Sequence, residues 1–206
     1  MKKILAFTAV LLFISTSSFI ATEPSTLSKG ERKYAAGLLK ETKKYFLKNT
    51  KGLSDAQLDF KASPEKWSIR QCMEHITLSE SFLDQMLQGV LNAPANPEKR
   101  AEIKITDEQI PVMLVDRTKK AQAPEPIQPK GSFKSADEAI QQFTIARDKH
   151  IEYMKTTTDD MRNHCAPHPA FGMMDSYQWM LLVAAHSKRH TLQIEEVKAS
   201  PGYPQQ

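Results

Sequence analysis

The chain has 206 residues, of which 40% are hydrophobic and 25% are charged. This length fits a single domain whose core needs no disulfide or metal to be stable. The formal net charge is only +4, and the 28 basic and 24 acidic residues are interspersed, so we expect no nucleic-acid partner.

Residues 1–21 have the layout of a secretory signal peptide. Lys2 and Lys3 precede a long apolar run that ends in serines and threonines. We expect cleavage between residues 17 and 22, a secreted or periplasmic location, and no membrane contact after cleavage. The alternative is an uncleaved anchor, because the apolar run is about long enough to span a bilayer.

Two amphipathic helices are expected in the first half of the mature chain. In the first, from Leu27 to about Lys48, apolar residues recur at helical spacing between lysines and glutamates. The segment that follows contains turn residues and a proline, which is typical of a connector. Ser68 and Gln71 then have the spacing of a capping box, which predicts a second helix that runs to about Leu91.

A long irregular crossover is expected over residues 92–134, because prolines interrupt this segment and no periodicity is sustained. Helical periodicity returns over residues 135–156, which predicts the third helix. Residues 157–175 are predicted to form a loop. The fourth helix is predicted over residues 176–199, because a proline and a glycine follow its end.

These elements predict an all-α fold, a four-helix bundle with the crossover between its second and third helices. No strand is expected. The predicted bundle domain covers residues 27–199. Bundles of this kind build their sites inside, from side chains of facing helices, so inward polar residues are the candidates for function.

Two histidines interrupt the apolar stripe of the fourth helix. His186 and His190 are four residues apart and therefore project to the same side of the helix. His75 lies on the second helix along a stripe that adjoins its main apolar face. Neutral imidazoles bind zinc, nickel, copper or iron, so three inward histidines could meet around one ion. The zincin motif is absent, because Ser187 stands where that motif needs glutamate.

Three other features favour structural explanations, although each leaves an alternative open. Cys72 is typical of a small buried hydrophobe, but it lies one turn before His75 and could supply a fourth metal ligand. His150 is expected to be partly buried or exposed on the third helix. His164, Cys165 and His168 fall in the loop before the last helix, where they could hold a metal or line a pocket.

Two segments together are similar to a known family. The stretch KWSIRQCMEHITLSE, followed about a hundred residues later by YQWMLLVAAHSKRHTLQIEEV, resembles the DinB-like (DinB/YfiT) superfamily of four-helix-bundle metalloproteins. The similarity covers essentially the whole mature chain. The family's triad, one histidine on the second helix and an H-x-x-x-H pair on the last, maps onto His75, His186 and His190. The resemblance thus implies a divalent transition metal, with zinc and nickel as the leading candidates.

The resemblance leaves the activity open between three functions. The leading hypothesis is a metal-dependent hydrolase of a small molecule, in which metal-activated water is the nucleophile. The alternatives are a thiol-dependent S-transferase and a non-enzymatic envelope protein that binds a metal or ligand. Export disfavours the thiol transferase, because cytosolic thiols are scarce outside the cell. A homodimer is also considered.

Two expectations concern the surroundings of the triad. A carboxylate or carbonyl should hold the outer nitrogen of each ring, and Glu74 and Glu80 are candidates on the second helix. Cys72 and Cys165 are expected not to form a disulfide, because one is placed near the site and the other in a remote loop.

Overall fold

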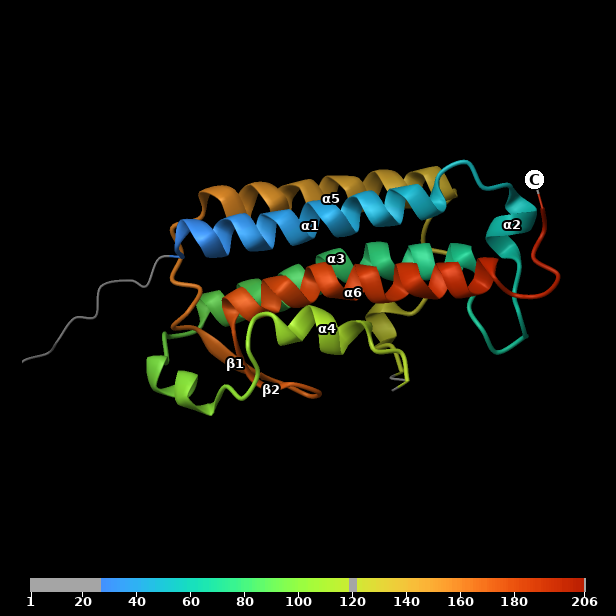
Figure 1. Cartoon of the computed structure of the whole chain (residues 1–206). Coiled ribbons are helices and arrows are strands. Elements are labelled where there is room, and N and C mark those ends of the chain that lie inside the picture. Colours follow the sequence, from blue (N-terminus) through green and yellow to red (C-terminus); the bar gives the residue numbers. More distant parts are fainter. Residues whose placement is uncertain (1–26, 119–121, 206) are drawn as a thin grey trace, which may run out of the picture.

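The computed structural model describes residues 27–118 and 122–205. Its framework is four long helices: α1 (Lys29–Thr50), α3 (Ile69–Asn92), α5 (Ala136–Thr156) and α6 (Ser176–Lys198) (Figure 1). Their bounds fall within about two residues of those predicted from sequence periodicity. The expected signal peptide, residues 1–21, lies outside the described residues.

Side-chain caps fix where each long helix begins. The predicted capping box at α3 is present, since Ser68 Oγ accepts the N–H of Gln71 and the Gln71 side chain accepts the N–H of Ser68. Ser28 and Glu31 form the same arrangement at α1. Each cap satisfies backbone donors that the first helical turn would otherwise leave without partners.

The direction of the helices explains the long crossover. α1 and α6 run one way along the bundle, and α3 and α5 run the other way (Figure 1). The α3–α5 connection must therefore return the length of the bundle. On its way it forms three short helical elements: η1 (Pro97–Glu102), α4 (Gln109–Val115) and η2 (Glu125–Ile127).

The crossover packs on the bundle more closely than its sequence indicated. α4 lies against α6, and Ile110 on α4 is fully buried (Figure 1). Ile127 on η2 is also buried. The connector before α3 likewise contains one short helix, α2 (Asp55–Asp59). These elements are too short for a periodic pattern to reveal them.

A small β-hairpin corrects the prediction of a strand-free fold. β1 (Cys165–His168) pairs antiparallel with β2 (Gly172–Asp175), so that Cys165 faces Asp175 and His168 faces Gly172. Each strand has four residues, and β1 contains a proline, which is why the pattern resembled a loop. The hairpin leads directly into α6.

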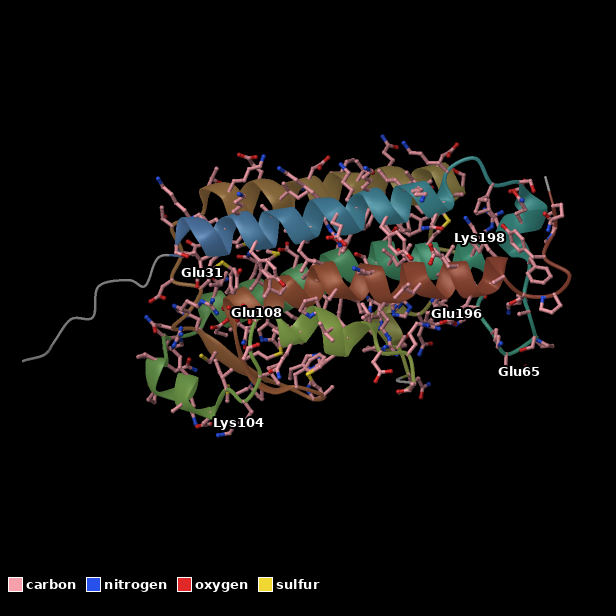
Figure 2. All side chains as sticks on the ribbon, in the orientation of Figure 1. Glu31, Glu65, Lys104, Glu108, Glu196 and Lys198 are labelled. Atoms are coloured by element: carbon pink, nitrogen blue, oxygen red, sulfur yellow. The ribbon has the colours of Figure 1, made fainter. Side chains whose placement is uncertain are left out.

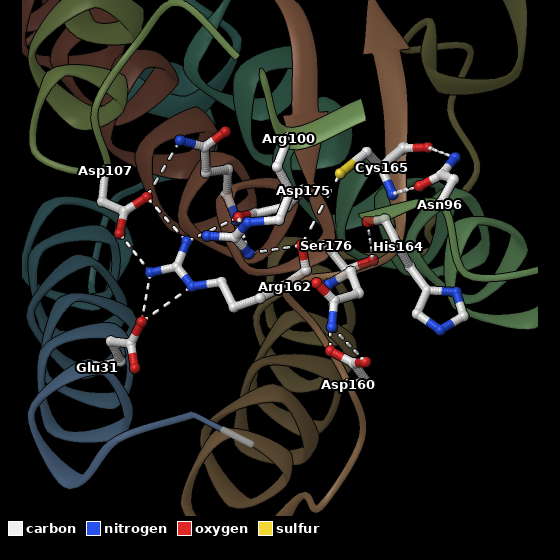
Figure 3. A network of polar contacts seen from close by, with 12 residues as sticks. Glu31, Asn96, Arg100, Asp107, Asp160, Arg162, His164, Cys165, Asp175 and Ser176 are labelled. Atoms are coloured by element: carbon white, nitrogen blue, oxygen red, sulfur yellow. Dashed lines mark hydrogen bonds and ion pairs between the residues drawn. The ribbon is translucent and has the colours of Figure 1, made fainter. Parts of the chain in front are cut away.

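Arg162 joins three elements at one end of the bundle (Figure 3). Its guanidinium lies 2.5 Å from Glu31 of α1, 2.6 Å from Asp107 of the crossover and 2.8 Å from Asp175, the cap of α6. It also stacks on the Tyr177 ring at 4.1 Å. Because Arg162 is largely buried, this network ties the crossover and the hairpin to the bundle.

A second charged group lies inside the bundle. Arg147 on α5 is fully buried and forms an ion pair with Glu80 on α3. Its guanidinium also donates to Thr42 and Ser187, so all four long helices contribute to this group. His150, predicted to be at most partly buried, is buried beside Glu80. The bundle therefore encloses a fully paired polar layer.

Most of the other charged side chains cover the outside. Figure 2 shows them projecting from the helices, with Glu196 and Lys198 near the end of α6 and Lys104 on the crossover. On α1, Ala35 and Leu39 face the core, whereas Tyr34 is 40% exposed. None of the helices in the described part of the chain combines the length and the apolar composition that a membrane span requires.

Candidate metal centre

Two helices bring the three predicted histidines together. His75 comes from α3, and His186 and His190 come from adjacent turns of α6. One ligand nitrogen from each ring lies within 4.8 Å of the others. The ring centroids are 4.3 to 5.0 Å apart. This separation allows one ion to contact all three imidazoles.

A crossover carbonyl fixes the tautomer of His75. Nδ1 of His75 lies 2.7 Å from the carbonyl oxygen of Ile127 on η2. A carbonyl oxygen can only accept a hydrogen bond, so Nδ1 must carry the proton. The lone pair of the neutral ring is therefore on Nε2, the nitrogen that faces the other two histidines.

A side-chain amide fixes the tautomer of His190. Nδ1 of His190 lies 2.9 Å from Oε1 of Gln193. Arg117, which only donates, contacts the same oxygen at 3.3 Å, so the amide orientation is fixed with oxygen toward both. Arg117 is itself held by Glu196 at 2.6 Å. The His190 lone pair is thus also on Nε2.

These two contacts create an unsatisfied pair of acceptors. Nε2 of His75 lies 3.2 Å from Nε2 of His190, and each outer nitrogen already holds its ring's proton. Two lone pairs that face each other at this distance repel unless a cation lies between them. A metal ion is therefore the group that this donor set fits.

Burial disfavours protonation of the three imidazoles, so a proton does not take the position between the two Nε2 atoms. It lowers the pKa of His190 to about 3, with a further contribution from His75. Burial also lowers the pKa of His75, against the opposing hydrogen bond to Ile127, and lowers the pKa of His186 well below its usual value. The rings are neutral at physiological pH, as metal ligands must be.

The three triad histidines differ in their exposure to solvent. His75 is 2% exposed, whereas His186 and His190 are partly exposed. Trp67, just before α3, packs over the rings, with its centroid 4.9 Å from His75 and 6.0 Å from His190. An ion held here would have protein on the His75 side and solvent access past the α6 histidines.

Cys72 does not join the converging ligands. It is fully buried in an apolar cluster with Phe46, Ile69 and Phe143. Burial raises the pKa of its thiol to about 12, so it is a protonated hydrophobe rather than a thiolate. Cys72 and Cys165 are both free and buried.

The other candidate residues have structural contacts. His150 is paired with Glu80, and His168 lies in the hairpin, where it stacks on Phe171. His164 and Cys165 lie at the start of the same hairpin, where the His164 carbonyl accepts the N–H of Ser176. None of them belongs to the group of described residues whose ligand atoms meet at the triad.

Neither glutamate proposed as a ring partner contacts a nitrogen of a triad histidine. Glu80 binds Arg147 and His150 instead. Glu74 accepts three backbone N–H groups from Lys130, Gly131 and Ser132 at 2.8 to 3.0 Å. The pKa of Glu74 is lowered, because these donors outweigh the raising effect of burial.

The Ile127 carbonyl could not be predicted, because every residue carries a carbonyl and only the fold brings this one to His75. Gln193 could have been found, since it lies three residues after His190 on the same helix face. Arg117 and Trp67 come from connecting segments. Their contacts with the site depend on the path of those segments.

A lysine-rich surface hollow lies on another part of the bundle. An open hollow of about 660 Å³ lies between α1 and α5, and its rim carries six lysines. No triad histidine lines it. The metal centre is therefore identified by its chemistry and not by the volume around it.

These features define a four-helix bundle with a three-histidine centre on two facing helices. The chain matches the DinB superfamily over residues 38–194, which is more than half of its length. It therefore belongs to the DinB superfamily. The predictions of this family and of an all-α four-helix bundle are confirmed.

Two relatives extend the comparison. The uncharacterized protein YuaE of Bacillus subtilis (strain 168) is 29% identical over 148 residues, which cover 72% of this chain and 87% of YuaE. The solved structure of YfiT from Bacillus subtilis has a TM-score of 0.59 and 16% identity, and the match covers 89% of this chain and 94% of YfiT. YfiT is described as a probable metal-dependent hydrolase with an unusual four-helix bundle topology. Because the identity to YfiT is only 16%, this structural similarity establishes the fold alone.

Proposed function

We propose that His75, His186 and His190 bind one divalent transition metal ion and that the protein is a metal-dependent hydrolase of a small molecule. The observation that carries the metal site is the 3.2 Å approach of two Nε2 atoms whose rings are protonated at Nδ1. The description of YfiT as a probable metal-dependent hydrolase supports the reaction class.

The donor set favours a catalytic site over a structural one. Structural zinc sites use four protein ligands, whereas catalytic sites use three and keep a position open. The described residues that converge here are three histidines, and the Cys72 thiol lies in the apolar core. A bound divalent ion would supply Lewis acidity and, in the case of zinc, lower the pKa of a coordinated water to about 7.

The chain's own residues orient the site and set its charge. The Ile127 carbonyl and the Gln193 amide hold two rings so that their Nε2 atoms point inward. Arg117 and Arg189 lie beside His190, and their charges help to keep its ring unprotonated. The charge of Arg117 is balanced by its ion pair with Glu196.

A substrate panel tests the reaction. Purified protein loaded with zinc or nickel is assayed against small esters, amides and phosphoesters, with and without a low-molecular-weight thiol. We expect thiol-independent hydrolysis that a chelator abolishes and added metal restores. Turnover that requires the thiol and consumes it would instead identify an S-transferase, and metal binding without turnover on any substrate would favour the non-enzymatic alternative.

We also propose that the protein is exported, because residues 1–21 have the layout of a signal peptide. Intact-mass analysis of the envelope or secreted fraction should show loss of about the first 21 residues. Recovery of the chain with Met1 retained would reject cleavage.

A further inference from the structure

The crossover contacts α3 twice within a short stretch, first at residue 127 and again at residues 130–132. Residues 127 and 130–132 are only a few positions apart, and they meet the adjacent residues His75 and Glu74. His75 donates to the Ile127 carbonyl, and Glu74 accepts the three N–H groups that follow. The residue next to a metal ligand therefore holds the same segment that orients that ligand.

The turn that Glu74 binds depends on a glycine. Gly131 has φ +83°, a left-handed conformation that L side chains rarely adopt. This conformation allows three successive N–H groups to converge on one carboxylate, as in other backbone anion sites. A Cβ at position 131 would meet no atom within 4 Å, so only backbone strain opposes a side chain there.

Both carboxylate oxygens of Glu74 are used in its contact with the turn. The Glu74 side chain is buried. Ile127 is buried as well. Its packing holds the carbonyl that accepts the hydrogen bond from His75. Without the turn contact, the hydrogen bond from His75 to the Ile127 carbonyl would have to hold the segment around η2 to α3 without the support of Glu74.

We propose that Glu74 and the turn at residues 130–132 form a positioning latch, which couples metal binding at the triad to docking of the crossover segment 122–134. Glu74 and Gly131 are positioning residues, because they act on His75 through the Ile127 carbonyl. This inference rests on the proposed metal site. It adds that metal affinity depends on residues that touch neither the ion nor a ligand ring.

The coupling is reciprocal by thermodynamic necessity. If docking of the latch orders His75 for the metal, then the metal must stabilise the docked latch by the same factor. Outer contacts of metal-ligating histidines typically change metal affinity about 10–100-fold. An effect near the lower end is expected here, because one of three ligands loses its orientation.

A matched set of glycine variants tests the latch. Gly52 also has a positive φ, +76°, and a Cβ there would likewise meet no atom within 4 Å. It lies in the turn after α1, and no hydrogen bond among the described residues joins it to the triad or to the crossover. Gly131→Ala and Gly52→Ala therefore carry similar backbone strain. We expect zinc affinity, measured by competition with a chromophoric chelator, to fall about tenfold in Gly131→Ala and to remain at the wild-type value in Gly52→Ala.

Two further variants separate positioning from general destabilisation. Gly131→Asn should recover most of the affinity, because asparagine tolerates the left-handed region better than alanine. Glu74→Gln should weaken zinc binding as Gly131→Ala does, since the amide keeps one acceptor oxygen and loses the charge. Equal affinities in Gly131→Ala, Glu74→Gln and Gly52→Ala would overturn the latch.

Amide hydrogen exchange measures the reciprocal effect, that of zinc binding on the turn at residues 130–132. In the wild type, zinc should slow exchange at Lys130, Gly131 and Ser132 and leave the turn at Gly52 unchanged. Zinc binding without such protection would contradict the coupling and leave the metal site intact. A wild-type protein that binds no zinc, nickel or cobalt would instead reject the proposed function, so the two failures are distinguishable.

Discussion

Nε2 of His75 lies 3.2 Å from Nε2 of His190, while the outer nitrogen of each ring donates to an oxygen that only accepts. This relationship leaves two lone pairs face to face on two different helices. It costs free energy in a bundle without a cation and is relieved when an ion binds. The contacts that hold the two rings in this arrangement thus prepare the site for a metal.

Gln193 is predicted to set the affinity of the site through His190. Gln193→Leu removes the acceptor for Nδ1 and frees the ring to change tautomer, so zinc affinity should fall about 10–100-fold. Long-range ¹⁵N–¹H correlation spectra should show His190 protonated at Nδ1 in the wild type. A wild-type spectrum with the proton on Nε2 would contradict the assignment of the lone pairs.

Cys72 is predicted to be a packing residue. Cys72→Ala should leave zinc affinity within about twofold and cost about 1 kcal/mol of unfolding free energy through the small cavity it creates. X-ray absorption of the zinc-loaded wild type should show only nitrogen and oxygen neighbours. A sulfur neighbour at about 2.3 Å, the zinc–thiolate distance, would mean a closed structural site.

The ion pair inside the bundle is predicted to stabilise the fold without taking part in metal binding. Arg147→Met leaves the Glu80 carboxylate buried without its main partner, so the free energy of unfolding should fall by about 3–5 kcal/mol. The double variant Arg147→Met, Glu80→Leu removes both charges and should recover part of this loss. A single variant as stable as the wild type, measured by urea unfolding, would show that the pair contributes little.

His150 is predicted to make stability depend on pH. Burial lowers its pKa, but hydrogen bonds to Asp84 and Glu80 outweigh burial and the charge of Arg147, so the folded-state pKa is raised above 6.5. The resulting stabilisation is fully present below the unfolded pKa of about 6.5 and is lost as pH rises through the higher folded-state pKa.

The unfolding free energy should therefore decline over that window, and His150→Gln should flatten the decline. Urea unfolding at a series of pH values measures both. A wild-type stability that rises through the same window would show that the imidazolium is not favoured in the fold.

Much of the framework follows from local sequence signals. Ser68 and Gln71 predicted the start of α3 because a capping box satisfies its donors within three residues. The i, i+4 spacing of His186 and His190 placed them on one face of α6 for a similarly local reason. The four-residue strands of the hairpin were missed, because so short a segment carries no measurable alternation.

The contacts that complete the site are long-range and could not be predicted. His75 and Ile127 are 52 residues apart, and the contact uses a backbone oxygen that every residue has. Glu74 was placed beside the site by its position on α3, but its contact with the turn depends on the path of the crossover. Only the folded crossover brings these groups together.

The central claim is that the three imidazoles bind one divalent ion. The most direct test is a zinc titration of metal-free wild type against His186→Ala, with His168→Ala as a control that removes a partly exposed histidine outside the triad. We expect one equivalent bound by the wild type and by His168→Ala, and in His186→Ala an affinity loss larger than the roughly 10–100-fold typical of outer contacts. Unchanged stoichiometry and affinity in His186→Ala, or no binding by the wild type, would contradict the metal centre.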